Sequence, residues 1–245
     1  MHAANLIPIY RRDPSHPQSA VCMACGVRQF ALFGALDDAA LDRIHQHIAD
    51  IRVEPGHRIY SAQDPGHAVY TVRGGVVRLE RVSEGGERRI LRLAGRTDLI
   101  GLEALLGQSY AADAVASTTV EVCRIPKTLI DELSAGEPQL VMDLMKRWQR
   151  ALDDAEEWLA ELATGPARRR MLRLMLKLSE FADPAGLVWM PMRDEMGAML
   201  DMTVETASRI VSALRREGVI EPVGPREARI DMPRLLAALN AQDAG

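Results

Sequence analysis

The three cysteines are the residues of this chain best suited to metal or redox chemistry. Cys22 and Cys25 are separated by two residues near the N-terminus, and Cys123 stands much later in the sequence. A thiolate binds soft metals and reacts with oxidants, whereas a buried thiol behaves as a small hydrophobe. Taken alone, Cys22 and Cys25 are a surface thiol pair, either inert or able to form a reversible disulfide. Cys123 taken alone is a buried apolar residue.

A second group of polar side chains, in the C-terminal third, could form directed hydrogen bonds. Glu205, Ser208 and Arg209 follow Thr203 within six positions. An arginine can bond both acceptors on the edge of a guanine, and a carboxylate can accept from the amino group of cytosine or adenine. A serine hydroxyl can donate or accept. These residue types therefore suit the reading of base edges in DNA.

Two short helices and a tight turn are expected to position this group. Asp194–Met199 predicts the first helix, Leu200–Met202 the turn, and Thr203 the N-cap of a second helix that ends near Gly218. The apolar positions expected to face inward on the second helix are Val204, Ala207, Ile210, Val211 and Leu214. Glu205, Ser208 and Arg209 then lie on its exposed side near the N-terminal end, which is typical of a helix-turn-helix.

Short strands flank this unit and fill the middle of the chain. Residues 219–223 and 228–232, around a turn at Gly224-Pro225, predict a wing. Between Ile51 and Arg124, short β-rich runs alternate with glycine turns, which indicates an antiparallel sandwich or roll. A helical turn is expected at residues 102–106.

A long helix is predicted after Pro138, because no glycine or proline follows until Gly165. Its apolar residues recur at steps of three and four: Val141, Leu144, Met145, Trp148, Leu152, Ala155, Leu159 and Leu162. The stripe fits either a core helix or a seam between two subunits. Gly165-Pro166 is a hinge candidate, and the helix expected at residues 167–181 carries Arg168–Arg170, either a solvated face or a phosphate contact.

Composition limits the class of protein. Of 245 residues, 47% are apolar and 26% charged, as in a globular protein, and no apolar run is long enough to span a membrane. No export signal is evident, so we expect a cytoplasmic protein, whose reducing surroundings argue against structural disulfides. We expect no enzyme, because a glycine-rich phosphate loop, a metalloprotease motif and a nucleophile elbow are all missing from the sequence.

The net charge of −4 permits a DNA-binding face without indicating one. From Ala160 onward, 12 basic residues balance 12 acidic ones, so the preceding part, with 18 basic and 22 acidic residues, carries the whole excess. DNA binding requires only a local basic surface.

Several motifs together resemble the Crp/Fnr family of transcription regulators. Residues 203–209 (TVETASR) and 214–220 (LRREGVI) are similar to the recognition segment of that family. Glu54-Pro-Gly, Asp64-Pro-Gly and residues 69–77 look like its β-roll, and residues 122–126 with the following long helix also match. The resemblance covers about residues 22–236 and is closest to the Fnr/FixK-type branch.

This resemblance implies an α+β fold with a defined order of domains. We expect an N-terminal segment with the CxxC motif at 1–29, a cyclic-nucleotide-binding-like β-roll sensor at 30–137 and a dimerisation helix at 138–163. A winged helix-turn-helix follows at 164–236, and then a tail at 237–245.

The resemblance also implies partners. Homodimers would bind a palindromic promoter site with TTGAT-like half-sites and act with RNA polymerase. The residues expected to contact DNA are Thr203, Val204, Glu205, Ser208 and Arg209. The alternative is a β-roll regulatory or scaffold protein that acts through protein partners, not DNA.

The resemblance further suggests an iron–sulfur centre as the sensor. The Fnr branch holds a 4Fe-4S cluster on three N-terminal cysteines and one in the roll; Cys22, Cys25 and Cys123 match, but Ala31 stands where the third N-terminal cysteine is expected. Asp37, Asp38 and His16 are candidates for the fourth ligand. Thiol redox chemistry, another metal and no cofactor remain alternatives, as does haem on His45, His47, His57 or His67.

Cyclic AMP is not expected to be the signal. Members that bind it carry an arginine–serine pair that contacts the cyclic phosphate, and this chain has Tyr110, Ala111 and Ala112 in that region, although it keeps Glu103. Without a cation, the phosphate lacks a charge partner. We therefore expect a response to oxygen or redox state.

Overall fold

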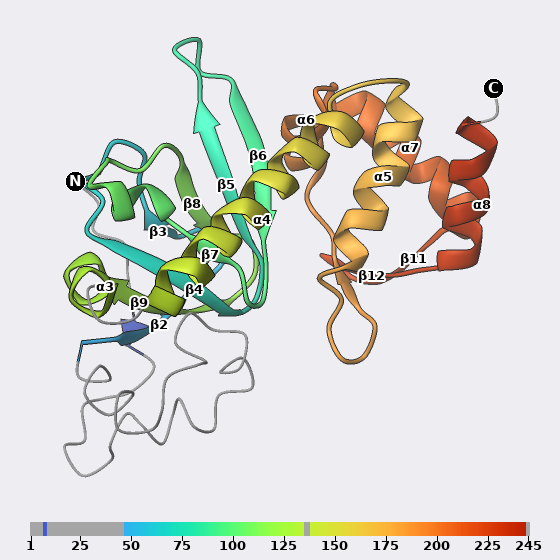
Figure 1. Ribbon diagram of the computed structural model, residues 1–245. Helices are drawn as coiled ribbons and strands as arrows, with labels where there is room; N and C mark the ends of the chain where they lie inside the picture. Colours follow the sequence, from blue (N-terminus) through green and yellow to red (C-terminus); the bar gives the residue numbers. More distant parts are fainter. Residues whose placement is uncertain (1–6, 9–46, 135–137, 244–245) are drawn as a thin grey trace. The chain divides into compact units, whose positions relative to one another are not determined.

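The computed structural model describes residues 7–8, 47–134 and 138–243 (Figure 1). The described chain falls into two compact units, one of residues 1–81 and 92–153 and one of residues 82–91 and 154–245. The α+β fold expected from the sequence, a β-roll followed by a long helix and a winged helix-turn-helix, is confirmed.

Antiparallel strands build the first unit. Its larger sheet has the order β1-β2-β9-β4-β7 and its smaller sheet the order β3-β8-β5-β6. The larger sheet consists of β1 (Ile7–Pro8), β2 (Ala49–Val53), β9 (Val120–Pro126), β4 (Ala68–Gly74) and β7 (Leu99–Ile100). The smaller sheet consists of β3 (Arg58–Tyr60), β8 (Asp113–Ala116), β5 (Val77–Val82) and β6 (Arg88–Ala94), of which residues 82 and 88–91 are grouped with the second unit. The 3-10 helix η2 (Leu102–Leu106) occupies the predicted helical turn.

The interior of the roll is filled by valine, isoleucine and tyrosine side chains. Tyr60 stacks on Tyr110 with ring centroids 4.0 Å apart and contacts Tyr70 at 5.5 Å. Gly101 permits this packing: it has a φ of 74°, and a Cβ atom there would lie 3.0 Å from the Tyr110 ring. Only glycine combines that backbone conformation with such a close approach.

The long helix α4 (Pro138–Leu162) follows the short helix α3 (Lys127–Ser134) and has two apolar faces. Leu140, Leu144, Trp158 and Leu162 are buried within the chain. Six other apolar residues are exposed at alternating steps of four and three: Val141, Met145, Trp148, Leu152, Ala155 and Leu159. The single stripe expected from the sequence is thus divided into a buried face and an exposed heptad seam.

Helices packed on a small sheet build the second unit. They are α5 (Ala167–Ser179), α6 (Arg193–Leu200), α7 (Val204–Arg216) and α8 (Met232–Asp243). The sheet has the order β10-β12-β11, formed by β10 (Val188–Trp189), β12 (Glu227–Ile230) and β11 (Ile220–Gly224). Met171, Met175 and Leu214 are completely buried between the helices.

The C-terminal segment differs from the sequence-based expectation. Residues 237–245 were expected to be a tail, but α8 continues to Asp243 and buries Leu235 and Leu239. These leucines are four positions apart and share one helix face, so the described residues 237–243 continue the packed helix instead of forming a tail.

None of the helices in the described part of the chain is long and apolar enough to cross a membrane.

Candidate nucleic-acid interface

A tight turn sets the geometry between α6 and α7. Asp201 ends α6 in the left-handed conformation with a φ of 51°, and its backbone N–H donates to Gly197 O. Gly197 itself allows the turn to fold back, because a Cβ atom there would lie 2.6 Å from Met202 O. Thr203 then starts α7: its Oγ1 accepts a hydrogen bond from the Thr206 backbone N–H at 3.2 Å, as a helix N-cap does.

The first turns of α7 bring the predicted base-reading side chains together on one exposed surface. Thr203, Glu205, Ser208 and Arg209 are all exposed. The helix is held from its other side by four buried residues, namely Ala207, Ile210, Val211 and Leu214.

Val204 was expected to face inward, and that orientation is wrong. Its side chain is 46% exposed. Val204 is the first residue of α7, one turn ahead of the positions where the helix packs on the rest of the unit. The residue therefore joins the exposed set, which is consistent with its other expected role beside DNA.

Glu205 lies at the start of α7, where hydrogen bonds favour its ionised form. Its own backbone N–H, and then the Thr203 hydroxyl, hold the pKa of the Glu205 carboxyl below its usual value. An ionised carboxylate only accepts hydrogen bonds, so this side chain is suited to contact an amino group.

Three arginines of α7 lack acidic partners. Among the residues that the structure describes, Arg209, Arg215 and Arg216 have no carboxylate within ion-pair distance. Arg193, at the start of α6, donates to Met196 Sδ at 3.4 Å and has no carboxylate partner in the described part of the chain. The pKa of Arg193 is lowered by partial burial and by the positive charge of Arg215.

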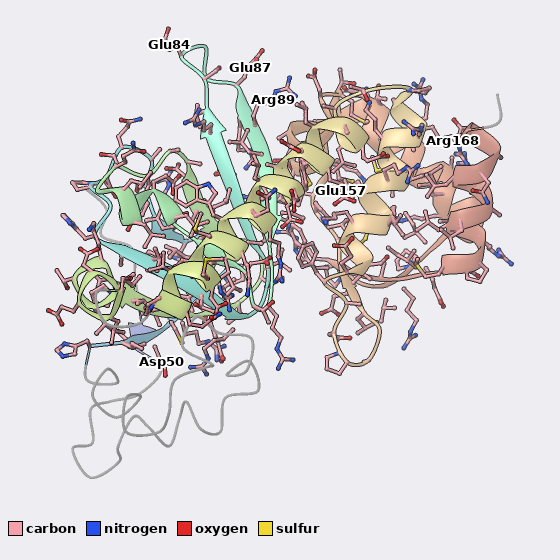
Figure 2. The ribbon with its side chains drawn as sticks, in the orientation of Figure 1. Asp50, Glu84, Glu87, Arg89, Glu157 and Arg168 are labelled. Atoms are coloured by element: carbon pink, nitrogen blue, oxygen red, sulfur yellow. The ribbon has the colours of Figure 1, made fainter. Side chains whose placement is uncertain are left out.

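The arginines of α5, in contrast, have partners within the second unit; Figure 2 labels Arg168 on this helix. Arg168 forms an ion pair with Glu217, and Arg173 contacts Glu161 at 2.9 Å. Arg169 lies 3.9 Å from the same Glu161 carboxylate. Arg170 donates to Leu200 O at the end of α6. The Arg168–Arg170 run therefore holds helices together, and its interpretation as a phosphate contact is not supported.

A buried carboxylate links the helix-turn-helix to the wing, and sequence reasoning missed it. Glu195 on α6 is 2% exposed and accepts from the Met192 backbone N–H at 2.7 Å. Arg226, beside β12, pairs with the same carboxylate and lies 5.2 Å from the Trp189 ring centroid. A glutamate directly before the apolar run of residues 196–200 was the available signal.

Of the three cysteines, Cys123 alone lies among the described residues. Cys22, Cys25 and the candidate ligands Asp37, Asp38, His16 and His45 lie outside the described residues, as does Ala31. Cys123 lies on β9, is half-buried, and donates through Sγ to Asp50 Oδ1 at 3.1 Å. Sequence reasoning missed Asp50, although an acid within a β-strand was a signal. No three metal-binding side chains gather among the described residues, so a centre at Cys123 also needs donors from beyond them.

The other sensor candidates are placed as follows. His47, His57 and His67 are exposed, with His57 Nδ1 3.3 Å from Glu54 O. Tyr110 is buried in the roll, and its hydroxyl donates to Ala68 O at 2.8 Å. Glu103 accepts from the Ala111 backbone N–H at 3.1 Å.

Two protein families match this chain. The cyclic nucleotide-binding domain matches residues 50–136, and the Crp-like helix-turn-helix domain matches residues 169–239. Together they cover more than half of the chain and include β2 to α3 and the complete α6–α7 unit.

Relatives match over most of their length. The chain is 29% identical over 219 residues to the transcriptional activator protein FnrA of Stutzerimonas stutzeri, with 87% of this chain and 89% of the relative covered. It is 26% identical over 221 residues to the anaerobic regulatory protein of Pasteurella multocida, with 88% and 81% covered.

A solved structure agrees in fold as well. FixK2 from Bradyrhizobium japonicum superposes with a TM-score of 0.70 at 25% identity, over 78% of this chain and 96% of that protein. These relatives are regulators, not enzymes, and the scaffold alternative finds no support among them. Both domain matches, the turn geometry of α6–α7 and the curated relatives lead to one assignment: the chain belongs to the Crp/Fnr family of DNA-binding transcription regulators.

Proposed function

We propose that this regulator binds a palindromic promoter site as a homodimer in the cytoplasm, acts with RNA polymerase, and responds to oxygen or redox state. The DNA-contacting residues are Thr203, Val204, Glu205, Ser208 and Arg209. The observation that carries the proposal is that these residues are all exposed on the first turns of α7, while the opposite face of the helix is buried and holds it in place. We also propose the domain roles: sensor 30–137, dimerisation helix 138–163 and DNA-binding domain 164–236.

Each side chain has a specific role on DNA. Arg209 bonds a guanine through two acceptors, and Glu205, ionised at neutral pH, accepts from a cytosine or adenine amino group. Ser208 donates or accepts beside them. This trio favours TTGAT-like half-sites. Arg193 and Arg215 supply phosphate contacts, because neither has a carboxylate partner among the described residues.

The exposed seam of α4 supports the homodimer. Val141, Met145, Trp148, Leu152, Ala155 and Leu159 follow a heptad pattern, the spacing with which two helices interdigitate. A second copy of the same seam covers this apolar surface, since a two-fold axis pairs identical patches. A dimer also presents two recognition helices to the two halves of a palindrome.

A matched pair of variants tests the dimer. Met145 and Met142 are both exposed methionines on α4, at 62% and 51%, but only Met145 lies on the seam. We expect Met145→Glu to weaken dimerisation about tenfold or more, because it buries a charge at the seam, and Met142→Glu to leave it unchanged. Sedimentation measures both; equal effects of the two substitutions would contradict the seam.

An iron–sulfur centre on Cys22, Cys25 and Cys123 is the proposed sensor. The half-buried thiol of Cys123, which lies beside the Asp50 carboxylate, supports this centre. Oxygen as the signal is supported by the relative from Pasteurella multocida, which is named an anaerobic regulatory protein. A 4Fe-4S cluster would supply oxygen-labile redox chemistry when bound. A cyclic nucleotide is a poor effector for this roll, because Tyr110 stacks inside it and Glu103 is already bonded to Ala111.

Two measurements test the function as a whole. Fluorescence anisotropy should show tighter binding to a TTGAT palindrome than to a scrambled duplex, and Glu205→Ala or Arg209→Ala should remove the preference without unfolding the protein. Visible absorption with iron and sulfide analysis, on protein purified without oxygen, should show a chromophore that bleaches in air. Colourless, iron-free protein would contradict the cluster but not DNA binding.

A further inference from the structure

Two stripes of opposite charge join the end of α4 to α5, and both lie in the second unit. The acidic stripe of α4 consists of Asp154, Glu157 and Glu161. The basic stripe of α5 consists of Arg169, Arg173 and Lys177. Within each stripe, neighbouring residues are three or four positions apart, so they share one face of their helix.

Lys177 makes the central contacts between the stripes. Its Nζ lies 3.2 Å from Glu157 Oε2 and 3.7 Å from Asp154 Oδ1 on α4, and 2.9 Å from Glu180 Oε2 directly after α5. Burial alone would lower the pKa of Lys177, but the hydrogen bonds to Glu180 and Glu157 raise it above its usual value. The lysine therefore stays charged, although only 18% of its side chain is exposed.

Glu161 makes a second connection, one helical turn further along α4. Its Oε2 lies 2.9 Å from Arg173 Nε and 3.9 Å from Arg169 Nη2 on α5. Trp158 and Leu162, which are 8% and 2% exposed, line the small cavity between the two helices. Isolated surface ion pairs contribute little, but a network of partly buried pairs beside an apolar contact holds two helices in one arrangement.

These contacts connect the two sides of Gly165-Pro166, the hinge candidate of the sequence. Gly165 has a φ of 85°, which glycine adopts without strain, and Pro166 is the N-cap of α5. The boundary between the two compact units falls elsewhere, between Asp153 and Asp154 inside α4. The last turns of α4 are therefore grouped with the winged helix-turn-helix, across the expected hinge.

We propose that the two stripes form a brace that locks Gly165-Pro166, so that α4 from Asp154 onward and the winged helix-turn-helix move as one rigid body. In a homodimer, the seam of α4 then sets the spacing of the two recognition helices directly, because no free joint intervenes. A signal that alters the seam reaches DNA without a rearrangement at Gly165-Pro166. This consequence for DNA rests on the proposed homodimer, whereas the lock itself does not.

The test uses Trp158 as a reporter of the joint in the full chain. Lys177→Gln removes the central charge, and Lys177→Arg keeps it. Lys146→Gln is the matched control, because Lys146 pairs with Asp143 within α4 itself, at 3.2 Å. Each protein is labelled with fluorotryptophan, and the fluorine NMR resonances are assigned by single substitutions to phenylalanine. The resonance of Trp189 on β10 reports whether the unit stays folded.

Relaxation dispersion of the Trp158 resonance measures how often the joint opens. We expect Lys177→Gln to raise the open population about fivefold, the effect of a lost ion pair, and to leave the Trp189 resonance unchanged. Lys177→Arg and Lys146→Gln should match the wild type. Glu161→Gln repeats the test from the acidic stripe. Unchanged exchange in both Lys177→Gln and Glu161→Gln, or a wild-type Trp158 resonance that is already split, overturns the lock.

DNA binding shows whether the lock serves recognition. Lys177→Gln should weaken binding to a TTGAT palindrome about fivefold and leave binding to a single half-site unchanged, because only the palindrome requires a fixed spacing of two helices. Equal weakening on both duplexes overturns the role of the brace in recognition alone. A wild type that binds neither duplex overturns the proposed function together with this role, and the Trp158 resonance then decides the lock by itself.

Discussion

The helices α5 and α7 belong to the same unit and are both rich in arginine, but their guanidinium groups have different surroundings. Arg168, Arg169 and Arg173 on α5 contact carboxylates of the same unit. Arg209, Arg215 and Arg216 on α7 have no such partner among the described residues. A surface cation that is already paired gives up an ion pair worth up to about 1 kcal/mol when it binds a phosphate, so the number of basic residues alone does not locate a nucleic-acid surface. A nucleic-acid surface is better located by arginines that have no carboxylate partner among the described residues.

The largest expected effect comes from breaking the ion pair between Arg226 and the buried carboxylate of Glu195. Arg226→Ala should lower the free energy of unfolding by about 3 kcal/mol, because Glu195 would remain buried without its cation. Urea denaturation measures the change. Arg229→Ala, which removes an exposed arginine of the same wing, should change stability by less than about 0.5 kcal/mol. Equal losses of unfolding free energy in the two variants would mean that the ion pair with Glu195 does not make Arg226 more important for stability than Arg229.

The next effect concerns sequence-specific binding. Arg209→Ala should weaken binding to the palindrome by about 2 kcal/mol, or roughly 30-fold, because a two-bond contact with guanine is lost. Binding to a scrambled duplex should change much less. Arg168→Ala on α5 should leave the ratio of the two affinities unchanged. Anisotropy titrations measure these affinities. If Arg168→Ala weakened binding to the palindrome as much as Arg209→Ala, the proposed difference between α5 and α7 would be wrong.

A smaller effect separates phosphate contacts from structural arginines. Arg215→Ala should reduce the slope of log affinity against log salt by about 0.9 per subunit, as expected for one lost phosphate contact. Arg173→Ala removes a cation that is bonded to Glu161 and should leave the slope unchanged. Titrations between low and moderate salt measure both slopes. A reduced slope for Arg173→Ala would place α5 against DNA after all.

The smallest expected effect is an absence of pH dependence. The pKa of Glu205 is lowered, so its charged form persists from neutral pH down through the range in which a free carboxyl, with a pKa of about 4.3, begins to protonate. The difference in base preference between the wild type and Glu205→Gln should therefore stay constant from pH 8 to pH 5. A difference that fades near pH 5 would show that the backbone and Thr203 do not stabilise the carboxylate.

The recognition helix could be predicted closely from sequence because its signals are local. Thr203 is a favoured N-cap, Gly218 follows the last turn, and the apolar spacing fixes the buried face. The exposure of Glu205, Ser208 and Arg209 follows directly from that spacing. Val204 was misassigned because a periodic pattern does not tell where a partner surface ends.

The β-roll was predictable as a class but not in its details. Glycine turns and β-rich runs indicated the strands, whereas the pairing of Asp50 with Cys123 joins positions 73 residues apart. No local propensity encodes such a register, since it depends on which strands become neighbours. The stacking of Tyr60 on Tyr110 has the same origin.

The sequence by itself determined the order of elements, the helix-turn-helix and the exposure of the side chains proposed to read bases, because capping, turn chemistry and helical periodicity act over a few residues. The tertiary structure alone decided which charges are neutralised and which remain available. It paired the arginines of α5, joined Glu195 to Arg226, divided the stripe of α4 into two faces and set Asp50 beside Cys123. Ion pairs and strand register depend on distances in space, and sequence separation does not specify them.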